Sequence, residues 1–286
     1  MSEGGTRTAM TARRQMTIAA IYRYPVKGLS AEPLERVALM PGECLPQDRR
    51  FAIALPATRF DPDHPEWLSK TNFVMLMRDE KLAQLNTRFA AQSGELTIMR
   101  AGMRAGMCAG EHAGDVVMRA CLTEPEGCRV VSEFLADFLG PAVEGPLRIV
   151  EAPGHAFADA RRKPNATTDK YVSLINLASI AALEAFVGAP VDPLRFRANV
   201  YLAGAPAWSE LDWIGRQIAL GGARLRVIAA ITRCAATQVN PATAERDRDI
   251  VGALQRGFGH NLMGVYAEIA EGGDIAIGDE LVVQQM

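Results

Sequence analysis

The sequence predicts a mainly β protein with some α-helix, in the α+β class. Short segments rich in β-branched and aromatic residues recur along the chain, and turn-forming Pro, Gly or Asn separates them. Only two segments show the apolar spacing of an amphipathic helix. The 286 residues are 49% hydrophobic and 22% charged, as in a globular protein of one large or two modest domains. Strands that follow one another through turns favour a barrel or sandwich over a βαβ array.

The first half of the chain is predicted to consist mostly of strands. Residues 17–24 form an apolar, β-branched run that Pro25 ends, and Pro56 ends a second run at residues 50–55. Further strands are expected at residues 34–40, 81–85, 96–99, 116–120 and 147–150. Loops are expected at residues 60–70, 101–114 and 152–170.

Two helices are predicted between and after these strands. Residues 130–139 carry apolar side chains at helical spacing, and Gly140 follows as a terminator. Residues 177–187 have the same spacing, with Asn176 as the N-cap and Gly188 as the C-terminal stop. The other strands of the second half are expected at residues 198–203, 217–220, 224–231, 264–269 and 280–283.

Charge and cysteine content exclude several classes of function. The net charge of −2 argues against a non-specific nucleic-acid binder, which needs a basic surface. The five cysteines include no C-x-x-C pair, so zinc-ribbon and iron–sulfur spacings are absent. No apolar run approaches the roughly 20 residues that span a bilayer, and no signal-peptide pattern is present. We therefore expect a cytoplasmic protein with no nucleic-acid or membrane partner and with reduced cysteines.

Cys234 is the first candidate for chemistry. It follows the β-branched run at residues 224–231 and stands next to Arg233, a setting that lowers a thiol pKa and suits a soft metal ligand. A cysteine after an apolar strand is otherwise a small buried apolar residue. Upstream, Arg197 and Asn199 are two residues apart, so on a strand both side chains would reach one ligand. The alternative is a solvated arginine and a turn-forming asparagine.

Several motifs in order resemble the MOSC family, the C-terminal domain of molybdenum-cofactor sulfurases. The motifs are FRAN, TRC, VNPATAERD, GVYAEI and GGDIAIGDELV in the second half of the chain. In the first half, YPVKG and QDRRF resemble the β-barrel domain that precedes the MOSC domain in this family, as in amidoxime-reducing-component-type proteins. The resemblance implies a smaller β-rich domain with flanking helices at 17–145 and a MOSC β-barrel domain at 146–286. The first residues are rich in Ser, Thr and Gly, so a disordered tail is expected at 1–16.

The resemblance also implies a site for the molybdenum cofactor, which is molybdenum held by a pyranopterin. Cys234 matches the metal-binding or sulfur-carrying cysteine of the family and is the candidate catalytic residue and metal ligand, since molybdenum is thiophilic. Lys27, Arg49 and Arg197 would bind the terminal phosphate. Asn199 would contact the pterin edge, and Tyr266 would lie nearby. The chain departs from the family at Gly28, where related reductases often have a serine.

The function implied is an oxidoreductase that reduces N-hydroxylated small molecules. The chain has no nucleotide-binding glycine fingerprint and no cysteine cluster, so a separate ferredoxin- or cytochrome-type protein with its own reductase is expected to supply electrons. The alternative is a sulfur-carrier or cofactor-handling module in which Cys234 holds a persulfide. A cysteine desulfurase would then be a partner, and its PLP would be bound by that partner. A Cys234–His260 hydrolase pair lacks any local signature.

Overall fold

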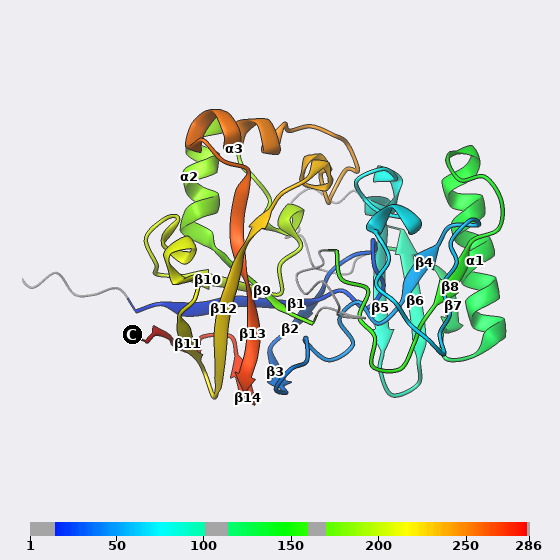
Figure 1. Ribbon diagram of the computed structural model, residues 1–286. Coiled ribbons are helices and arrows are strands. Elements are labelled where there is room, and N and C mark those ends of the chain that lie inside the picture. The colour runs from blue at the N-terminus through cyan, green and yellow to red at the C-terminus, as the bar shows by residue number, and fades with distance from the viewer. Residues whose placement is uncertain (1–14, 101–113, 160–169, 285–286) are drawn as a thin grey trace, which may run out of the picture.

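The chain is mainly β, with three α-helices among residues 15–100, 114–159 and 170–284, which the computed structural model describes (Figure 1). Its largest element is a sheet of eight strands in the order β15-β11-β12-β13-β9-β10-β1-β2. These strands are β1 (Thr17–Arg23), β2 (Glu32–Leu34), β9 (Val172–Asn176), β10 (Val200–Ala203), β11 (Gln217–Leu220), β12 (Ala223–Thr232), β13 (Leu262–Glu271) and β15 (Leu281–Val283). The predicted fold class is confirmed.

The large sheet curls because β15, at one edge, also forms hydrogen bonds with the start of β1, near the other edge. The Ile18 N–H donates to the Asp279 carbonyl at 2.9 Å, and the Leu281 N–H donates to the Met16 carbonyl at 2.8 Å. These bonds tie the start of β1 to the approach and start of β15, so the sheet bends toward a barrel. The inner face is filled by fully buried aliphatic side chains, Val200 and Val265 among them.

Helix α2 (Leu177–Val187) connects β9 to β10, which lie parallel. This is the helix predicted from its caps: the Asn176 side chain accepts from the Ala178 N–H at 3.1 Å, and Gly188 takes φ 69°. Helix α3 (Ile250–Phe258) packs beside α2 on one side of the sheet (Figure 1).

The remaining strands form smaller sheets, the first of which packs on the core of the large sheet, while the others surround a second apolar core. They are β3 (Arg36–Leu39) with β14 (Gly273–Ala276), β4 (Ala52–Ala54) with β8 (Arg148–Val150), and the meander β5 (Leu85–Ala90), β6 (Glu95–Arg100) and β7 (Val116–Cys121). Helix α1 (Pro125–Leu139) covers β7 and β8. It extends the helix predicted at 130–139 by a turn and a half toward its N-terminus.

One predicted strand is wrong. Residues 81–84 belong to a 3₁₀ helix, Glu80–Gln84, and the strand begins only at Leu85. The preceding turn causes the difference: the Leu82 N–H donates to the Asp79 carbonyl, and the buried Asp79 carboxylate accepts from the Met75 N–H at 3.2 Å. The strands β2, β5, β9 and β14 and the helix α3 were not predicted as such.

The topology joins the two halves of the sequence. Strands β1 and β2, from the first half, extend the sheet built by residues after 170, and β3 pairs with β14. The division at residue 146 stays a prediction. The expected tail at 1–16 and the loops at 101–114 and 152–170 fall largely outside the described residues. No helix in the described part of the chain has the length and apolarity needed to cross a membrane.

Candidate functional site

A hollow of about 150 Å³ lies where the first half of the chain meets the large sheet. We call it the main hollow. Five of the six residues predicted for the site line it, together with further cations. Its chemically active lining is Lys27, Arg49, Arg197, Arg233, Cys234 and Tyr266. A smaller adjoining hollow contains the sixth predicted residue, Asn199, and shares Arg49, Asp159, Ser173 and Tyr266 with the main one.

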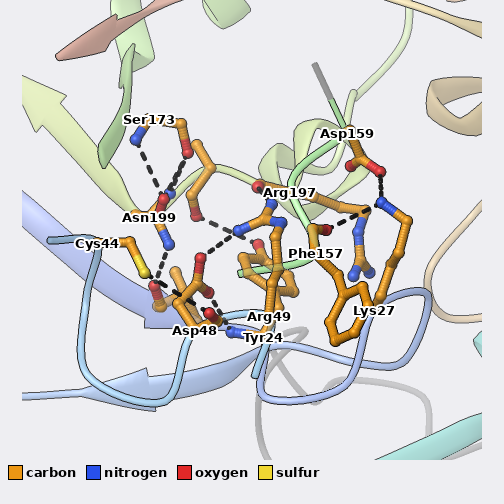
Figure 2. A network of polar contacts seen from close by, with 12 residues as sticks. Tyr24, Lys27, Cys44, Asp48, Arg49, Phe157, Asp159, Ser173, Arg197 and Asn199 are labelled. Atoms are coloured by element: carbon orange, nitrogen blue, oxygen red, sulfur yellow. Dashed lines mark hydrogen bonds and ion pairs between the residues drawn. The ribbon is translucent and has the colours of Figure 1, made fainter. Parts of the chain in front are cut away.

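Lys27 reaches the main hollow from the turn after β1. Its N–H donates to the Phe51 carbonyl at 2.8 Å, which fixes the turn. The side chain is 3% exposed, and its Nζ donates to the Phe157 carbonyl at 3.0 Å and to the Asp159 carboxylate (Figure 2). Burial lowers the pKa of Lys27, while Asp159 opposes that shift. A buried ammonium of this kind needs an anion in contact with it.

Arg49 is held by an aspartate next to it in the sequence. The residue has φ 51°, and its N–H donates to the Tyr24 carbonyl at 2.7 Å. Its guanidinium pairs with the Asp48 carboxylate, whose other oxygen accepts from the Tyr24 N–H at 2.7 Å (Figure 2). Burial alone would lower the pKa of Arg49, but Asp48 and Asp159 raise it, so the cation is permanent.

Arg197 lines the main hollow, but its backbone is not the strand that was predicted. It has φ 52° and ends a 3₁₀ helix, Pro193–Phe196, so it does not alternate with Asn199 along a strand. Its guanidinium lies 4.4 Å from the centre of the Tyr24 ring. Burial, and then the neighbouring Arg49, lower the pKa of Arg197. The two arginines therefore repel each other across this part of the hollow.

Asn199 joins three strands. Its Oδ1 accepts from the Ser173 N–H at 3.1 Å and from the Ser173 hydroxyl at 2.8 Å, and its Nδ2 donates to the Tyr22 carbonyl at 3.2 Å. The side chain is 1% exposed. These contacts give Asn199 a structural role at the junction of β1, β9 and β10. Tyr266, on β13, lines both hollows, and its ring centre lies 5.7 Å from that of Tyr171.

Cys234 follows β12 and starts a 3₁₀ helix, Ala235–Gln238. Its carbonyl accepts from the Thr237 hydroxyl at 2.9 Å and from the Thr237 N–H at 3.0 Å, which leaves its half-buried free thiol beside the main hollow. Arg233, next to it, donates at 2.8 Å to the carbonyls of Met263 and Phe196. Arg233 therefore ties the segment that carries Cys234 to β13 and to the 3₁₀ helix Pro193–Phe196.

Sequence reasoning missed Arg195, which ties the Cys234 segment to the rest of the site. Its guanidinium donates to the Gln238 carbonyl at 3.1 Å and pairs with Asp247 at 2.6 Å. The Asn240 amide donates to the other Asp247 oxygen at 2.9 Å. The VNPATAERD motif is thus a loop closed on a buried arginine. Its position directly before the FRAN motif was its only sequence signal.

Asp159 is a second missed residue, and no local pattern marks it. Desolvation alone would raise its pKa, but Lys27 and Arg49 hold the pKa of this carboxyl well below its ordinary value. The described residues bring together no group of three or more His, Cys, Asp or Glu side chains suited to a metal ion. His260 packs against Trp208, with ring centres 5.3 Å apart, and is not part of the lining described for the main hollow.

Comparison with known proteins finds a recognised domain that includes Arg197, Cys234 and Tyr266 but neither Lys27 nor Arg49. Residues 154–282 match the family model of the MOSC domain. The solved structure of the YuaD protein from Bacillus subtilis is similar at 14% identity and a TM-score of 0.41, over 94% of this chain and 95% of that one. YiiM from Geobacillus stearothermophilus is similar at 21% identity and a TM-score of 0.32, over 40% of this chain and 54% of that one.

Proposed function

We propose that the main hollow binds the molybdenum cofactor and that the chain uses it to reduce N-hydroxylated small molecules. One observation carries the proposal: the Cys234 thiol lines the same hollow as Lys27, Arg49 and Arg197. A thiol and a group of cations in one hollow are the donor set that a thiophilic metal with a phosphate-bearing ligand requires. The match of residues 154–282 to the MOSC domain supports this assignment, because that domain is associated with this cofactor.

The residues present fit the cofactor in chemistry. Cys234 offers a metal ligand, and Lys27, Arg49 and Arg197 offer charge-assisted hydrogen bonds to a phosphate. The volume of the main hollow is small for such a ligand: it is about 150 Å³, whereas small-molecule pockets have roughly 300–1,000 Å³. A pyranopterin therefore requires side chains at the edge of the hollow to move aside.

The chain contributes binding and orientation to the reaction. When bound, the cofactor supplies a two-electron centre that accepts an oxygen atom. Reduction of an N-hydroxyl group consumes two electrons and two protons and yields the N–H product and water. An iron–sulfur or haem protein with its own reductase supplies the electrons. The buried cations Arg49 and Arg197 hold the anionic end of the cofactor, and Tyr266 borders the space beside it.

Co-purification tests this proposal. The full chain is expressed in a host that makes molybdopterin, and molybdenum and pterin are measured per chain by mass spectrometry and fluorescence. We expect near-stoichiometric amounts of both, together with reduction of an amidoxime or hydroxylamine by a reduced viologen. A chain without metal or pterin that carries a persulfide on Cys234 after incubation with a cysteine desulfurase would instead establish the sulfur-carrier function. The cytoplasmic location would be tested by fractionation of the native host.

A further inference from the structure

The lining of the main hollow includes one carboxylate, Asp159, which differs from the neighbouring Asp48 in burial and in the number of its partners. Asp48 is 3% exposed and is fixed by the Tyr24 N–H and by Arg49, so it is part of the framework. Asp159 differs, because its side chain is 48% exposed and, among the described residues, its carboxylate pairs only with Lys27 (Figure 2). It lies on an irregular segment after β8, outside every helix and strand.

Asp159 blocks access to Lys27. The ammonium group is 3% exposed, and its described contacts are the Phe157 carbonyl, the Asp159 carboxylate and the face of the Phe73 ring at 5.9 Å. Carboxylate and phosphate oxygens accept the same charge-assisted hydrogen bonds from an ammonium. An anionic ligand that contacts Lys27 must therefore take the place of the Asp159 carboxylate.

We propose that Asp159 is an internal counter-ion that occupies the anion position at Lys27 and leaves it when a phosphate-bearing ligand binds. The identity of that ligand rests on the proposed function, whereas the competition for Lys27 does not. In the ligand-free chain Asp159 compensates the buried charge of Lys27, and its departure widens the main hollow on the side where Lys27 and Arg49 meet. Asp159 thus sets the affinity of the hollow for phosphate groups.

Two consequences follow from this exchange. Without a ligand, Asp159→Asn leaves the Lys27 ammonium buried and without its anion, so the protein becomes less stable. With phosphate present, the same variant regains stability, because the anion no longer competes with a carboxylate. A ligand that binds only the native state raises the free energy of unfolding by RT ln(1 + L/Kd), where L is the concentration of free ligand, and the melting temperature rises with it.

The test compares the wild type with Asp159→Asn as full chains made in a host without molybdopterin. Binding of inorganic phosphate is measured by calorimetry at low ionic strength, where surface screening is weak, and melting temperature is measured with and without phosphate. We expect Asp159→Asn to melt lower without phosphate, to bind phosphate about tenfold more tightly than the wild type, and to gain more in melting temperature when phosphate is added. Lys27→Met should lose the binding.

Glu126→Gln is the matched control. It removes a carboxylate that pairs with Arg129 on the exposed face of α1, and it should change neither phosphate affinity nor its effect on stability. Equal or weaker phosphate binding by Asp159→Asn, with a melting temperature that phosphate does not restore, would show that Asp159 is only a structural ion pair. Failure of the proposed function would appear separately, as a wild-type chain that carries no molybdenum or pterin when it is made in a host that synthesises molybdopterin.

Discussion

At the scale of single residues, Tyr24 explains how two arginines stay close together without a ligand. Its ring is 1% exposed, and the guanidinium carbons of Arg49 and Arg197 lie 5.1 and 4.4 Å from its centre. Burial raises the pKa of Tyr24 well above its ordinary value, so the ring stays neutral and its face attracts both cations. The Tyr24 hydroxyl donates to the Ala198 carbonyl at 3.2 Å. The cations are therefore positioned before an anion arrives, which reduces the entropic cost of binding it.

The thiols should differ in reactivity. Burial, and then Asp48, raise the pKa of Cys44 to about 12, so at pH 8 almost none of it is thiolate, the nucleophilic form. Cys234 is half-buried beside the main hollow. We expect iodoacetamide at pH 8 to modify Cys234 at least about tenfold faster than Cys44, as measured by peptide mass spectrometry over time. Equal rates at the two cysteines would contradict this environment for Cys44.

The Cys234→Ser variant should lose catalysis. A hydroxyl is a poorer ligand for a thiophilic metal than a thiolate. We expect reduced-viologen-dependent reduction of an amidoxime to fall at least about a hundredfold, with the circular dichroism spectrum unchanged. Cys128→Ser is the control. Cys128 lies on helix α1, where its thiol donates to the Leu122 carbonyl at 3.1 Å, and it is not in the described lining of the main hollow. Full turnover by Cys234→Ser at full metal content would exclude it as a ligand.

At the scale of elements, the loop after Cys234 depends on one ion pair. Arg195 is 3% exposed, and Asp247, to which it is bonded, is 24% exposed. Asp247→Asn should therefore lower the free energy of unfolding by about 1.5–3 kcal/mol at pH 7, the contribution of a hydrogen bond to a charged group. Asp137→Asn, on the exposed face of α1, should have little effect. Urea denaturation measures both.

The effect of Asp247 should depend on pH. Burial alone would raise its pKa, but hydrogen bonds from Arg195 and Asn240 hold the pKa below the ordinary value. A carboxyl with a depressed pKa stabilises the folded state above its unfolded pKa of about 3.9, and that contribution disappears as the pH falls through the folded value. The difference in unfolding free energy between the wild type and Asp247→Asn should therefore shrink below about pH 4. A difference that stays constant from pH 7 to pH 3 would contradict a role for the charge.

Local sequence predicted those elements whose ends carry their own signals. Helix α2 was predicted to the residue because Asn176 and Gly188 cap it within the chain. Strand β9 was missed because all five of its residues are buried between neighbours, so it shows no alternation of polar and apolar side chains. Strand β2 contains Pro33, which argues against a strand in sequence but is tolerated at the edge of the sheet.

The site residues also fall into those that local sequence predicted and those that it could not predict. Cys234, Lys27, Arg49 and Arg197 were found through motifs, and the fold brings them to one hollow. Asp159 could not be found, because its role arises only from contact with Lys27, 132 residues away. Long-range pairs of this kind leave no periodic pattern in the sequence.

At the scale of the whole molecule, the main hollow is formed by parts of the chain that are distant in sequence. Lys27 and Arg49 come from the first half, and Arg197, Cys234 and Tyr266 from the second. Because β1 pairs with β10, the turn that carries Lys27 follows a strand of the same sheet that contains β13, with Tyr266, and β12, which precedes Cys234. The cations and the thiol therefore depend on one cooperative fold, and separate halves of the chain would not form this hollow.

The proposed reaction in the main hollow depends on an external supply of electrons. The proposed reaction needs two electrons per substrate, and the sequence has neither a nucleotide-binding glycine fingerprint nor a cysteine cluster. We expect the purified chain, loaded with molybdenum and pterin, to show no NADH- or NADPH-dependent reduction of a hydroxylamine. A reduced viologen, or a ferredoxin with its reductase, should produce turnover that Cys234→Ser loses and Cys128→Ser keeps. NADPH-driven turnover by the isolated chain would reveal a nicotinamide or flavin site elsewhere in the molecule. A loaded chain that stays inert with a strong artificial donor across amidoximes, hydroxamates and hydroxylamines would reject the oxidoreductase and leave Cys234 as a sulfur carrier.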